Sequence, residues 1–326
     1  MKTTTLKRVL AAVILTAMVV CMFTGCSTKD DGVYTVGICQ LVTHEALDAA
    51  TQGFKDALTE KLGDKVKFDF KDAAGDSPTC ATIATQFVTD KVDLIMANAT
   101  PALQAAMAAT GDIPIVATSI TDFATALEID DWTGKSGINV TGTADLAPLD
   151  KQAAMVKELV PDAKKIGILY CSAEPNSKYQ ATVVAAELKK LGFETKEYTI
   201  ADSNEIASVA TTACDQVDAI YVPTDNTLAS AAAAVEQIAG PKNIPVVAGE
   251  EGICKGCGVA TLSISYYDIG YKAGMMAYEI LVNGADAGEM EIQTADTTTK
   301  KYIESRATAL GLTVPSDYAA IEMDAE

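Results

Sequence analysis

The chain has 326 residues, and its 49% hydrophobic content excludes an intrinsically disordered protein. Its 44 acidic residues outnumber 25 basic ones, which gives a formal net charge of −19. That sign opposes nucleic-acid binding, which needs basic side chains to displace counterions from phosphate. His44 is the single histidine, so a histidine-rich metal centre is excluded, and we expect neither a metal ion nor another cofactor.

The N-terminus has the pattern of an export signal. Lys2, Lys7 and Arg8 precede the apolar run Val9–Met22, which is too short to span a membrane stably. The run ends at Phe23-Thr24-Gly25-Cys26, which resembles the bacterial lipoprotein cleavage box, with Phe23 where leucine is usual.

This resemblance implies that residues 1–25 are a lipoprotein signal peptide, that Cys26 receives the lipid anchor with its palmitate, and that residues 26–32 are a tether. Removing three basic and no acidic residues changes the formal charge from −19 to −22. We therefore expect a chain held by lipid at the outer face of the cell membrane. An uncleaved signal anchor is the alternative.

From Val33 onward, short β-branched runs alternate with longer amphipathic ones. In the first half, strands are expected at 34–38, 66–70, 93–96 and 113–117. Helices are expected at 44–62 and 80–88, and a third, alanine-rich helix follows Pro101 and ends near residue 109. A second, similar series places strands at 165–170, 194–198, 219–222, 245–248 and 260–264, and helices at 152–159, 178–191, 205–214, 229–238, 268–281 and 303–310. The alternation predicts an α/β fold with parallel sheets covered by helices.

The length indicates two domains, because about 300 residues exceed one ordinary hydrophobic core. We predict two doubly wound parallel-sheet lobes joined by a multi-strand hinge. The first comprises 33–141 plus 265–284, and the second 142–264 plus 285–326. The segment Ile138–Gly142 and two later crossovers are the expected hinge.

Ligands of open parallel sheets bind beyond the carboxyl ends of the strands. Six loops follow expected strands, and all are rich in hydroxyl, amide or carboxyl groups: 40–44, 98–101, 118–122, 172–177, 223–226 and 249–252. Several of them lead into helices, whose first N–H groups suit a carboxylate. The alternative for each polar side chain is a structural role as a helix N-cap.

Several stretches resemble the ABC transporter substrate-binding lipoproteins that include tryptophan- and tyrosine-binding members. They run in order from about Val33 to Pro315, and they are GICQLVTHEALDAATQGFKDAL, ATPALQAA, DIPIVATSITD, NVTGTAD, AKKIGILYCSAEPNS, VDAIYVPTDNTLASA and SYYDIGYKAG. The resemblance implies a type I periplasmic-binding fold that closes around one ligand and delivers it to a permease.

The expected ligand-binding residues combine the positions implied by this family with Glu250 of the 249–252 loop. They are Thr43, His44, Asn98, Thr100, Ser119, Thr121, Asp122, Asn176, Ser177, Thr224, Asp225, Asn226, Glu250 and Tyr266.

Two features depart from the family pattern. Phe123 replaces the proline that commonly follows the Thr-Asp pair, which alters the expected pocket wall. The segment Cys254-Lys255-Gly256-Cys257 stands where a glycine-rich turn is usual. Because it lies between two strand-like runs, we expect a tight surface loop, with a thioredoxin-like redox pair as the alternative.

The chemistry of the loops indicates an amino acid as the ligand. Arg306 lies far along the chain in an expected terminal helix, so the cleft loops offer no arginine fork for a phosphate or dicarboxylate. Hydroxyl groups and backbone amides are suited to one carboxylate, and Asp225 or Glu174 to an ammonium group. Three aromatic residues are candidates for contact with an aromatic or apolar side chain: Phe123, Tyr179 and Tyr266.

Three function classes compete. A monomeric binding protein of an ABC importer accounts for the signal, the anchor, the twin lobes and the missing catalytic groups. A ligand-sensing lipoprotein that feeds a signalling receptor is the main alternative. A lipid-anchored enzyme on the same fold is disfavoured, because one histidine supplies no evident nucleophile–base pair.

Overall fold

The computed structural model describes residues 32–323 of the chain. The predicted signal peptide, the lipidated Cys26 and nearly all of the tether lie outside the described residues. Within 32–323, the helices are too short or too polar for any of them to cross a lipid bilayer.

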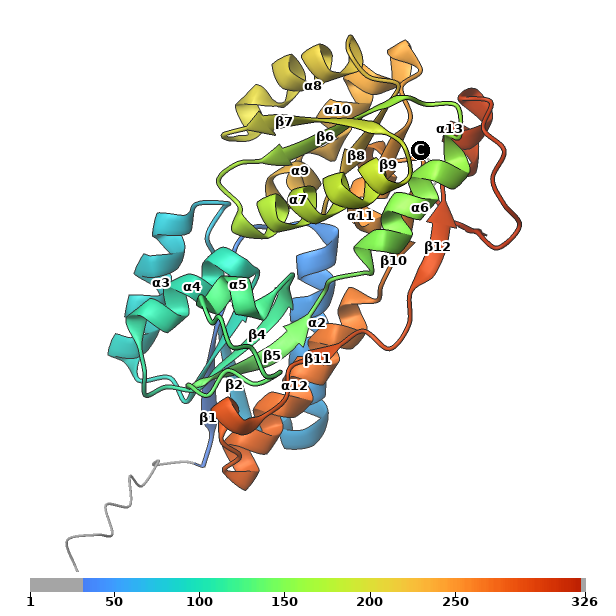
Figure 1. The fold of residues 1–326 in the computed structure, drawn as a ribbon. Helices are drawn as coiled ribbons and strands as arrows, with labels where there is room; N and C mark the ends of the chain where they lie inside the picture. Colours follow the sequence, from blue (N-terminus) through green and yellow to red (C-terminus); the bar gives the residue numbers. More distant parts are fainter. Residues whose placement is uncertain (1–31, 324–326) are drawn as a thin grey trace, which may run out of the picture. The chain divides into compact units, whose positions relative to one another are not determined.

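A six-stranded sheet forms the centre of what we term the N-terminal lobe (Figure 1). Its strand order is β11-β5-β4-β3-β1-β2, and all neighbouring strands are parallel. The strands are β1 (Tyr34–Gln40), β2 (Val66–Asp72), β3 (Leu94–Asn98), β4 (Ile115–Ile120), β5 (Val140–Ala144) and β11 (Gln293–Thr294).

A seven-stranded sheet forms the centre of the C-terminal lobe, in the order β13-β12-β10-β9-β8-β6-β7. Only the β10–β12 pair is antiparallel among its neighbouring strands. The strands are β6 (Lys165–Cys171), β7 (Glu194–Ile200), β8 (Ala219–Val222), β9 (Val246–Ala248), β10 (Ala260–Ser263), β12 (Thr299–Tyr302) and β13 (Ala319–Ala320).

The two sheets repeat one topology. In chain order, the first five strands of each lobe are arranged 2-1-3-4-5, which is the order of a doubly wound fold with a switch point between its first and third strands. The predicted fold class of two parallel α/β lobes is therefore confirmed.

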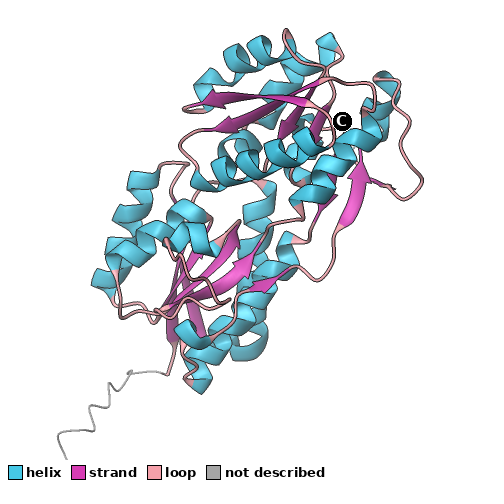
Figure 2. Cartoon of the chain, viewed as in Figure 1, coloured by secondary structure: helices cyan, strands magenta, loops and turns pink. Residues whose placement is uncertain are grey.

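Helices cover both faces of each sheet (Figure 2). The N-terminal lobe carries α2 (Glu45–Leu62), α3 (Ser77–Asp90), α4 (Thr100–Ala109), α5 (Phe123–Leu127) and α12 (Tyr266–Asn283). The C-terminal lobe carries α6 (Leu149–Leu159), α7 (Pro175–Lys190), α8 (Ile206–Cys214), α9 (Asn226–Ser230), α10 (Ala232–Ala239), α11 (Glu251–Cys257) and α13 (Glu304–Ala309). Short 3-10 turns occupy Gly63–Lys65, Ser203–Glu205, Gly240–Lys242 and Ala287–Glu289.

The cores follow from this layering. On one face of the N-terminal sheet, Phe54 and Leu58 of α2 pack with Ala273 and Met276 of α12. On the other face, α3 and α4 contribute to a second core that includes Phe87. Strands β3 and β4 are buried along their whole length, as expected for the centre of a sheet covered on both sides.

The chain passes between the two sheets three times: after β5, after β10, and between β11 and β12. The domain boundaries predicted from the sequence stay a prediction, since sheet membership alone does not define rigid bodies.

Strand β4 runs to Ile120, three residues beyond its predicted end at Ala117. The β4–β5 register shifts between Ala117 and Ile120, and Ser119 adopts a left-handed φ of 58° inside this bulge. Opposite the bulge, a Cβ on Gly142 would lie 1.9 Å from the Ala117 carbonyl oxygen, so only glycine fits. Bulges of this kind redirect a side chain, and they are frequent beside functional sites.

Helices α2 and α12 cross at glycines, which allows their backbones to approach closely. A Cβ on Gly270 would lie 2.0 Å from the carbonyl oxygen of Ala50, and one on Gly53 would lie 2.1 Å from that of Tyr267. These helices bury one face of the N-terminal sheet, so their separation sets the packing of that core.

We expect Gly270→Ala to destabilise the chain by about 1–3 kcal/mol, because the added methyl group forces two backbones apart. Thermal or urea denaturation measures the change. Gly111→Ala is the matched control, since a Cβ there meets nothing within 4 Å. Equal stability of the two variants would contradict this account of the crossing.

Candidate functional site

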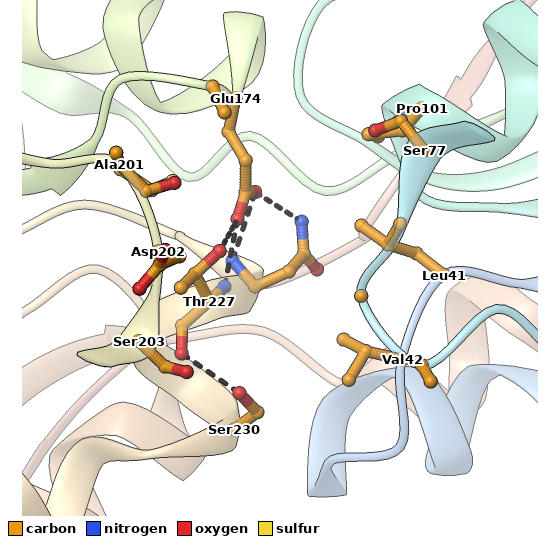
Figure 3. A pocket seen from close by; sticks show the side chains of 15 residues that line it. Leu41, Val42, Ser77, Pro101, Glu174, Ala201, Asp202, Ser203, Thr227 and Ser230 are labelled. Carbon is orange, nitrogen blue, oxygen red and sulfur yellow. Dashed lines mark hydrogen bonds between the residues drawn. The ribbon is translucent and has the colours of Figure 1, made fainter. Parts of the chain in front are cut away.

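The carboxyl ends of the parallel strands of both sheets border a cavity of about 220 Å³ between the lobes. Figure 3 shows its two walls facing each other. The N-terminal wall contains the apolar side chains of Leu41, Val42 and Pro101, whereas the C-terminal wall is polar and includes Glu174 and Thr227. Such a volume is below that of drug-sized pockets and suits a small solute.

Glu174 organises the polar wall. Its carboxylate accepts hydrogen bonds from the backbone N–H and Nδ2 of Asn226 (3.1 and 2.6 Å), and from the backbone N–H and Oγ1 of Thr227 (both 2.8 Å). Asn176 Nδ2 adds a fifth bond at 3.1 Å. With both oxygens engaged inside the lobe, this buried carboxylate holds the start of α9 in place.

Three carboxylates among the predicted binding residues cap helices. Asp122 accepts from Thr125 N–H (2.7 Å) at the start of α5, and Asp225 accepts from Leu228 N–H (2.8 Å) at the start of α9. Glu250 accepts from the N–H groups of Gly252 and Ile253 at the start of α11. The alternative of an N-cap role, which the sequence left open, therefore describes the geometry of these three residues.

The charges of two caps are affected by burial. Burial, followed by the nearby charge of Glu174, raises the pKa of Asp225 to about 8. Burial likewise raises the pKa of Glu250 to about 7, although its N–H partners oppose the rise. Both oxygens of Asp225 also bond backbone groups, since Cys171 N–H donates to Oδ2 at 2.7 Å.

Helices α4 and α7, like α2, begin at the cleft without a side-chain cap. Helix α4 begins at Thr100, directly after Ala99 with its left-handed φ of 86°. Helix α7 begins at Pro175 with no side-chain bond to its first N–H groups. Free N–H groups at a helix start attract a carboxylate, and strained backbone of this kind is typical of functional sites.

A group of five buried polar side chains, which we call the inner polar cluster, extends inward from Glu174 and links the lobes. Its members are Thr121, Asp145, Asn176, Gln180 and Tyr266. Gln180 Nε2 lies 3.3 Å from Thr121 Oγ1 of the opposite lobe and donates to the Thr224 carbonyl oxygen at 3.0 Å. The Tyr266 hydroxyl donates to Asp145 Oδ2 at 2.8 Å.

A second cavity, of about 320 Å³, lies at the crossover side of the cleft and has Tyr266 in its wall. The inner polar cluster therefore connects Glu174, in the wall of the first cavity, with Tyr266, in the wall of the second. Glu45 of α2 and Glu251 of α11 also line this second cavity.

Several buried polar atoms at the carboxyl ends of the strands have no hydrogen-bond partner. They are His44 Nδ1, Asn98 Oδ1, Ser119 Oγ, Asp145 Oδ1 and Asn176 Oδ1. Buried polar atoms are nearly always paired in folded proteins, so this concentration indicates groups reserved for a solute or water. Among the described residues, the sixth such atom is Thr261 Oγ1, in β10.

The predicted residues separate into groups. His44 Nε2 contacts Asn226 Oδ1 across the cleft at 3.2 Å, and burial lowers the pKa of His44, which keeps the ring neutral at pH 7. Asn98 and Thr100 lie at the end of β3, and Ser177 and Thr224 lie beside Asn176. Thr43 is apart from these, because it is exposed and donates to Asp72 at 2.8 Å.

Asp145 and Gln180 were not among the binding residues predicted from the sequence. Asp145 ends the stretch NVTGTAD and follows the carboxyl end of β5, which was the signal available. Gln180 lies one helical turn after Asn176, so the two share a face of α7.

The aromatic candidates lie mostly in cores. Phe123 is buried and stacks on Trp132, with ring centroids 6.4 Å apart. Tyr179 packs against the core of the C-terminal lobe. Tyr266 alone of the three brings a polar group into the inner polar cluster.

The prediction of a tight surface loop at Cys254-x-x-Cys257 is wrong. These residues lie in helix α11, and both thiols are buried and free. Arg306 closes the end of the helix by donating to the carbonyl oxygens of Cys254, Lys255, Gly256 and Gly258 at 2.6–3.0 Å. Burial raises the pKa of both thiols, that of Cys257 to about 12, which opposes the reactive thiolate of a thioredoxin-like site.

Residues 32–323 contain no group of three or more histidine, cysteine, aspartate or glutamate side chains placed to hold a metal ion. The site offers hydroxyl, amide and carboxylate groups at the carboxyl ends of the strands.

Two parallel-sheet lobes that border a cavity and carry unpaired polar atoms at the carboxyl ends of their strands define a bilobal solute-binding protein. The chain belongs to the family of ABC transporter substrate binding proteins, whose family model matches residues 35–320.

Similar proteins include a tyrosine-binding protein from Clostridioides difficile, which is 39% identical over 90% of this chain and 89% of its own length. An ABC domain from Streptococcus pneumonia, solved in complex with L-Trp, is 34% identical, with a TM-score of 0.83 over 87% of this chain and 96% of that one. A substrate-binding protein with adhesive properties from Clostridium difficile, solved ligand-free and open, is 38% identical, with a TM-score of 0.68 over 90% of this chain and all of that one.

We expect native alkylation with iodoacetamide to leave Cys254 and Cys257 unmodified, because both thiols are buried and protonated. Arg306→Ala should increase their modification several-fold, since the end of α11 then loses the donor that holds four carbonyl groups. Peptide mass mapping after a timed reaction measures the modified fraction of each cysteine.

Cys39 and Cys80 are the internal controls, because they are buried in the other lobe. Rapid modification of Cys254 or Cys257 in the unmutated chain would contradict the buried arrangement.

Proposed function

We propose that this chain is the extracytoplasmic solute-binding component of an ABC importer and that it binds an aromatic α-amino acid between its lobes. The observation that carries the proposal is the set of buried polar atoms without partners at the opposed carboxyl ends of the two sheets. The named ligands of similar proteins, tyrosine and L-Trp, support the class of ligand.

The carboxylate of the amino acid fits the N-terminal lobe. Ser119 Oγ is a free hydroxyl donor in the β4 bulge, and the uncapped start of α4 follows the neighbouring strand β3. Because the one arginine of the described residues is bonded to carbonyl groups of α11, these neutral donors are the ones suited to the carboxylate.

The rest of the ligand has complementary surroundings. Unpaired oxygens of Asn98, Asp145 and Asn176 accept hydrogen bonds, as an ammonium group requires. The apolar wall formed by Leu41, Val42 and Pro101 suits a hydrophobic side chain. The unpaired polar atoms supply donors and acceptors, and the cavity wall supplies apolar surface, a combination that an aromatic amino acid matches.

Binding closes the lobes about the three crossovers. The TM-score is higher to the L-Trp complex than to the open, ligand-free structure, although the latter protein has the higher sequence identity. This difference supports an arrangement of lobes like that of a ligand complex. A ligand that contacts both lobes only when they are closed supplies the differential affinity that shifts the population.

We further propose that residues 1–25 are a cleaved signal peptide and that Cys26 carries the lipid anchor at the outer face of the membrane. The monomeric, closed chain then docks on the permease and releases its ligand without chemical change. The family membership supports the transport role, and the cleavage-box resemblance supports the anchor.

Isothermal titration of the chain with the common amino acids tests the ligand class. We expect saturable heat with L-tyrosine or L-tryptophan, and at least about tenfold weaker binding in Ser119→Ala, because a hydrogen bond to a charged group is lost. Ser119→Gly removes the same hydroxyl while favouring the left-handed backbone, so both variants should lose affinity to a similar degree. Absence of heat with every amino acid would refute the proposal.

An ion pair between the lobes provides a test of closure. Lys255 of α11 contacts Glu45 of α2, and this contact requires the two lobes to approach. Exposed pairs contribute about 0.2–1 kcal/mol, so Glu45→Gln should weaken ligand binding by about 1.4- to 5-fold at low salt and have no effect at high salt.

Glu187→Gln is the matched control, because Glu187 pairs with Lys190 within α7. Small-angle scattering should also show a smaller radius of gyration when ligand saturates the chain. An unchanged radius at saturation would contradict hinge closure.

A further inference from the structure

Asp145 is a buried carboxylate with one oxygen unpaired. It follows β5 at the first crossover and is 5% exposed. Oδ2 accepts from the Tyr266 hydroxyl at 2.8 Å, whereas Oδ1 has no partner. A buried carboxylate oxygen without a partner is costly, so its retention calls for a group that binds there.

The surroundings of Asp145 lack a cation. Its pKa is affected by burial first, then by hydrogen bonds from Tyr266 and Thr121, with no contribution from a lysine or arginine. The other carboxylates near the cleft differ from Asp145 in their hydrogen bonds, because Glu174, Asp225 and Glu250 have both oxygens engaged by donors of their own lobe. Asp145 is therefore the acidic group in the inner polar cluster with acceptor capacity left.

We propose that Asp145 Oδ1 binds the α-ammonium group of the ligand and selects amino acids over the corresponding carboxylic acids. This inference rests on the proposed function of the site. An ammonium group has three donors, and Asn176 Oδ1 on the opposite lobe is a second unpaired acceptor in the same cluster. An ammonium group held by both residues links the lobes, so recognition and closure are coupled.

Tyr266 positions the carboxylate. Its ring is buried at the first turn of α12, and its hydroxyl fixes Oδ2, which leaves Oδ1 to the ligand. Burial and the Asp145 charge raise the pKa of Tyr266 well above its usual value, so the hydroxyl remains a donor at all working pH values.

Amino-acid binding should consequently depend on pH. Burial raises the pKa of Asp145 to about 6 in the unliganded chain. Below that pH the carboxyl group is protonated and its charge is lost, so the dissociation constant should increase by up to about tenfold per pH unit. Above about pH 7 the carboxyl group of Asp145 is ionised, so its titration should cause no further change in affinity.

Other titratable groups lie around the site, and the comparison of variants must separate the effect of their titration on affinity from that of Asp145. They are His44, Asp122, Glu174, Asp225 and Glu250, together with Tyr266 itself. Each is retained when Asp145 alone is changed to asparagine, so the difference between the two pH profiles reports Asp145.

The experiment uses the full chain and two pairs of probes. L-tyrosine is compared with 3-(4-hydroxyphenyl)propionate, and L-tryptophan with 3-(indol-3-yl)propionate, which lack only the ammonium group. We expect the unmutated chain to prefer the amino acid by about 100-fold or more. Asp145→Asn should lose most of that preference, bind the propionate within about threefold of the unmutated chain, and have a flatter pH profile between 5 and 7.

Two further variants distinguish a binding role from a structural one. Tyr266→Phe removes a hydrogen bond that lowers the pKa of Asp145, so the midpoint of the affinity–pH curve should move to higher pH. Asp112→Asn, at an exposed position before the start of β4 and so at the opposite end of that strand from the cluster, should leave affinity and midpoint unchanged.

Thermal unfolding without ligand supplies a readout independent of binding. The folded-state pKa of Asp145 is raised, so its ionised form destabilises the unliganded chain at pH 7, and that loss disappears as the pH falls below the unfolded value. Asp145→Asn should therefore raise the melting temperature at pH 7 and have a much smaller effect near pH 4.

The outcomes are separable. If the unmutated chain binds no amino acid, the proposed function fails and this inference fails with it. If it binds an amino acid while Asp145→Asn binds the same amino acid equally well with the same pH profile, only the role of Asp145 is overturned. Loss of the amino acid preference together with retained propionate binding supports that role directly.

Discussion

The structure depends on one geometric constraint: all strands of a parallel sheet end at the same edge. Both lobes have the 2-1-3-4-5 strand order, so each has a switch point where adjacent loops diverge and leave room for a solute. In this chain, polar residues at the carboxyl ends of the two sheets contact each other, as His44 does with Asn226. The polar atoms without partners are concentrated at these ends because the topology brings so many loop starts together.

Much of this was accessible from the sequence. The alternation of β-branched and amphipathic runs indicated two doubly wound lobes, and burial of Phe54 and Leu58 in α2 follows the spacing that predicted the helix. The loops after the strands were also located. Local composition was sufficient here, because the periodicity of each element is a property of a few consecutive residues.

The roles of individual side chains were less accessible. Asp122, Asp225 and Glu250 begin helices, where a carboxylate suits both a cap and a ligand site, and only the bond to a backbone N–H three residues later separates the two. Asp145 was overlooked because it begins a crossover instead of a strand-to-helix loop. The segment Cys254–Cys257 is a helix too short for periodicity to identify, and it depends on Arg306, which is distant in sequence.

The placement of Arg306 also determines what the cleft can recognise. Its guanidinium group is occupied by four carbonyl oxygens and lies 3.4 Å from Glu236, so it serves the C-terminal lobe alone. Recognition of a carboxylate then depends on neutral donors, and these are effective only when water is excluded and their geometry is fixed. The strained bulge at Ser119 and the left-handed Ala99 are such fixed positions, and each imposes a conformational cost that the surrounding sheet offsets.

The same groups give a physical reason for the closure proposed above, in which a ligand is needed to hold the lobes together. When the lobes are in contact without a solute, the oxygens of Asp145 and Asn176 are buried without donors, and this costs free energy relative to an open form in which water reaches them. Some direct contacts between the lobes, such as that of Lys255 with Glu45, are exposed and individually weak. A solute that supplies the missing donors removes the desolvation cost while keeping those contacts, so it shifts the population toward closure by its differential affinity. Under the proposed mechanism, an empty chain has reason to stay open and a loaded chain to stay closed, and this is the distinction that the proposed permease partner would detect.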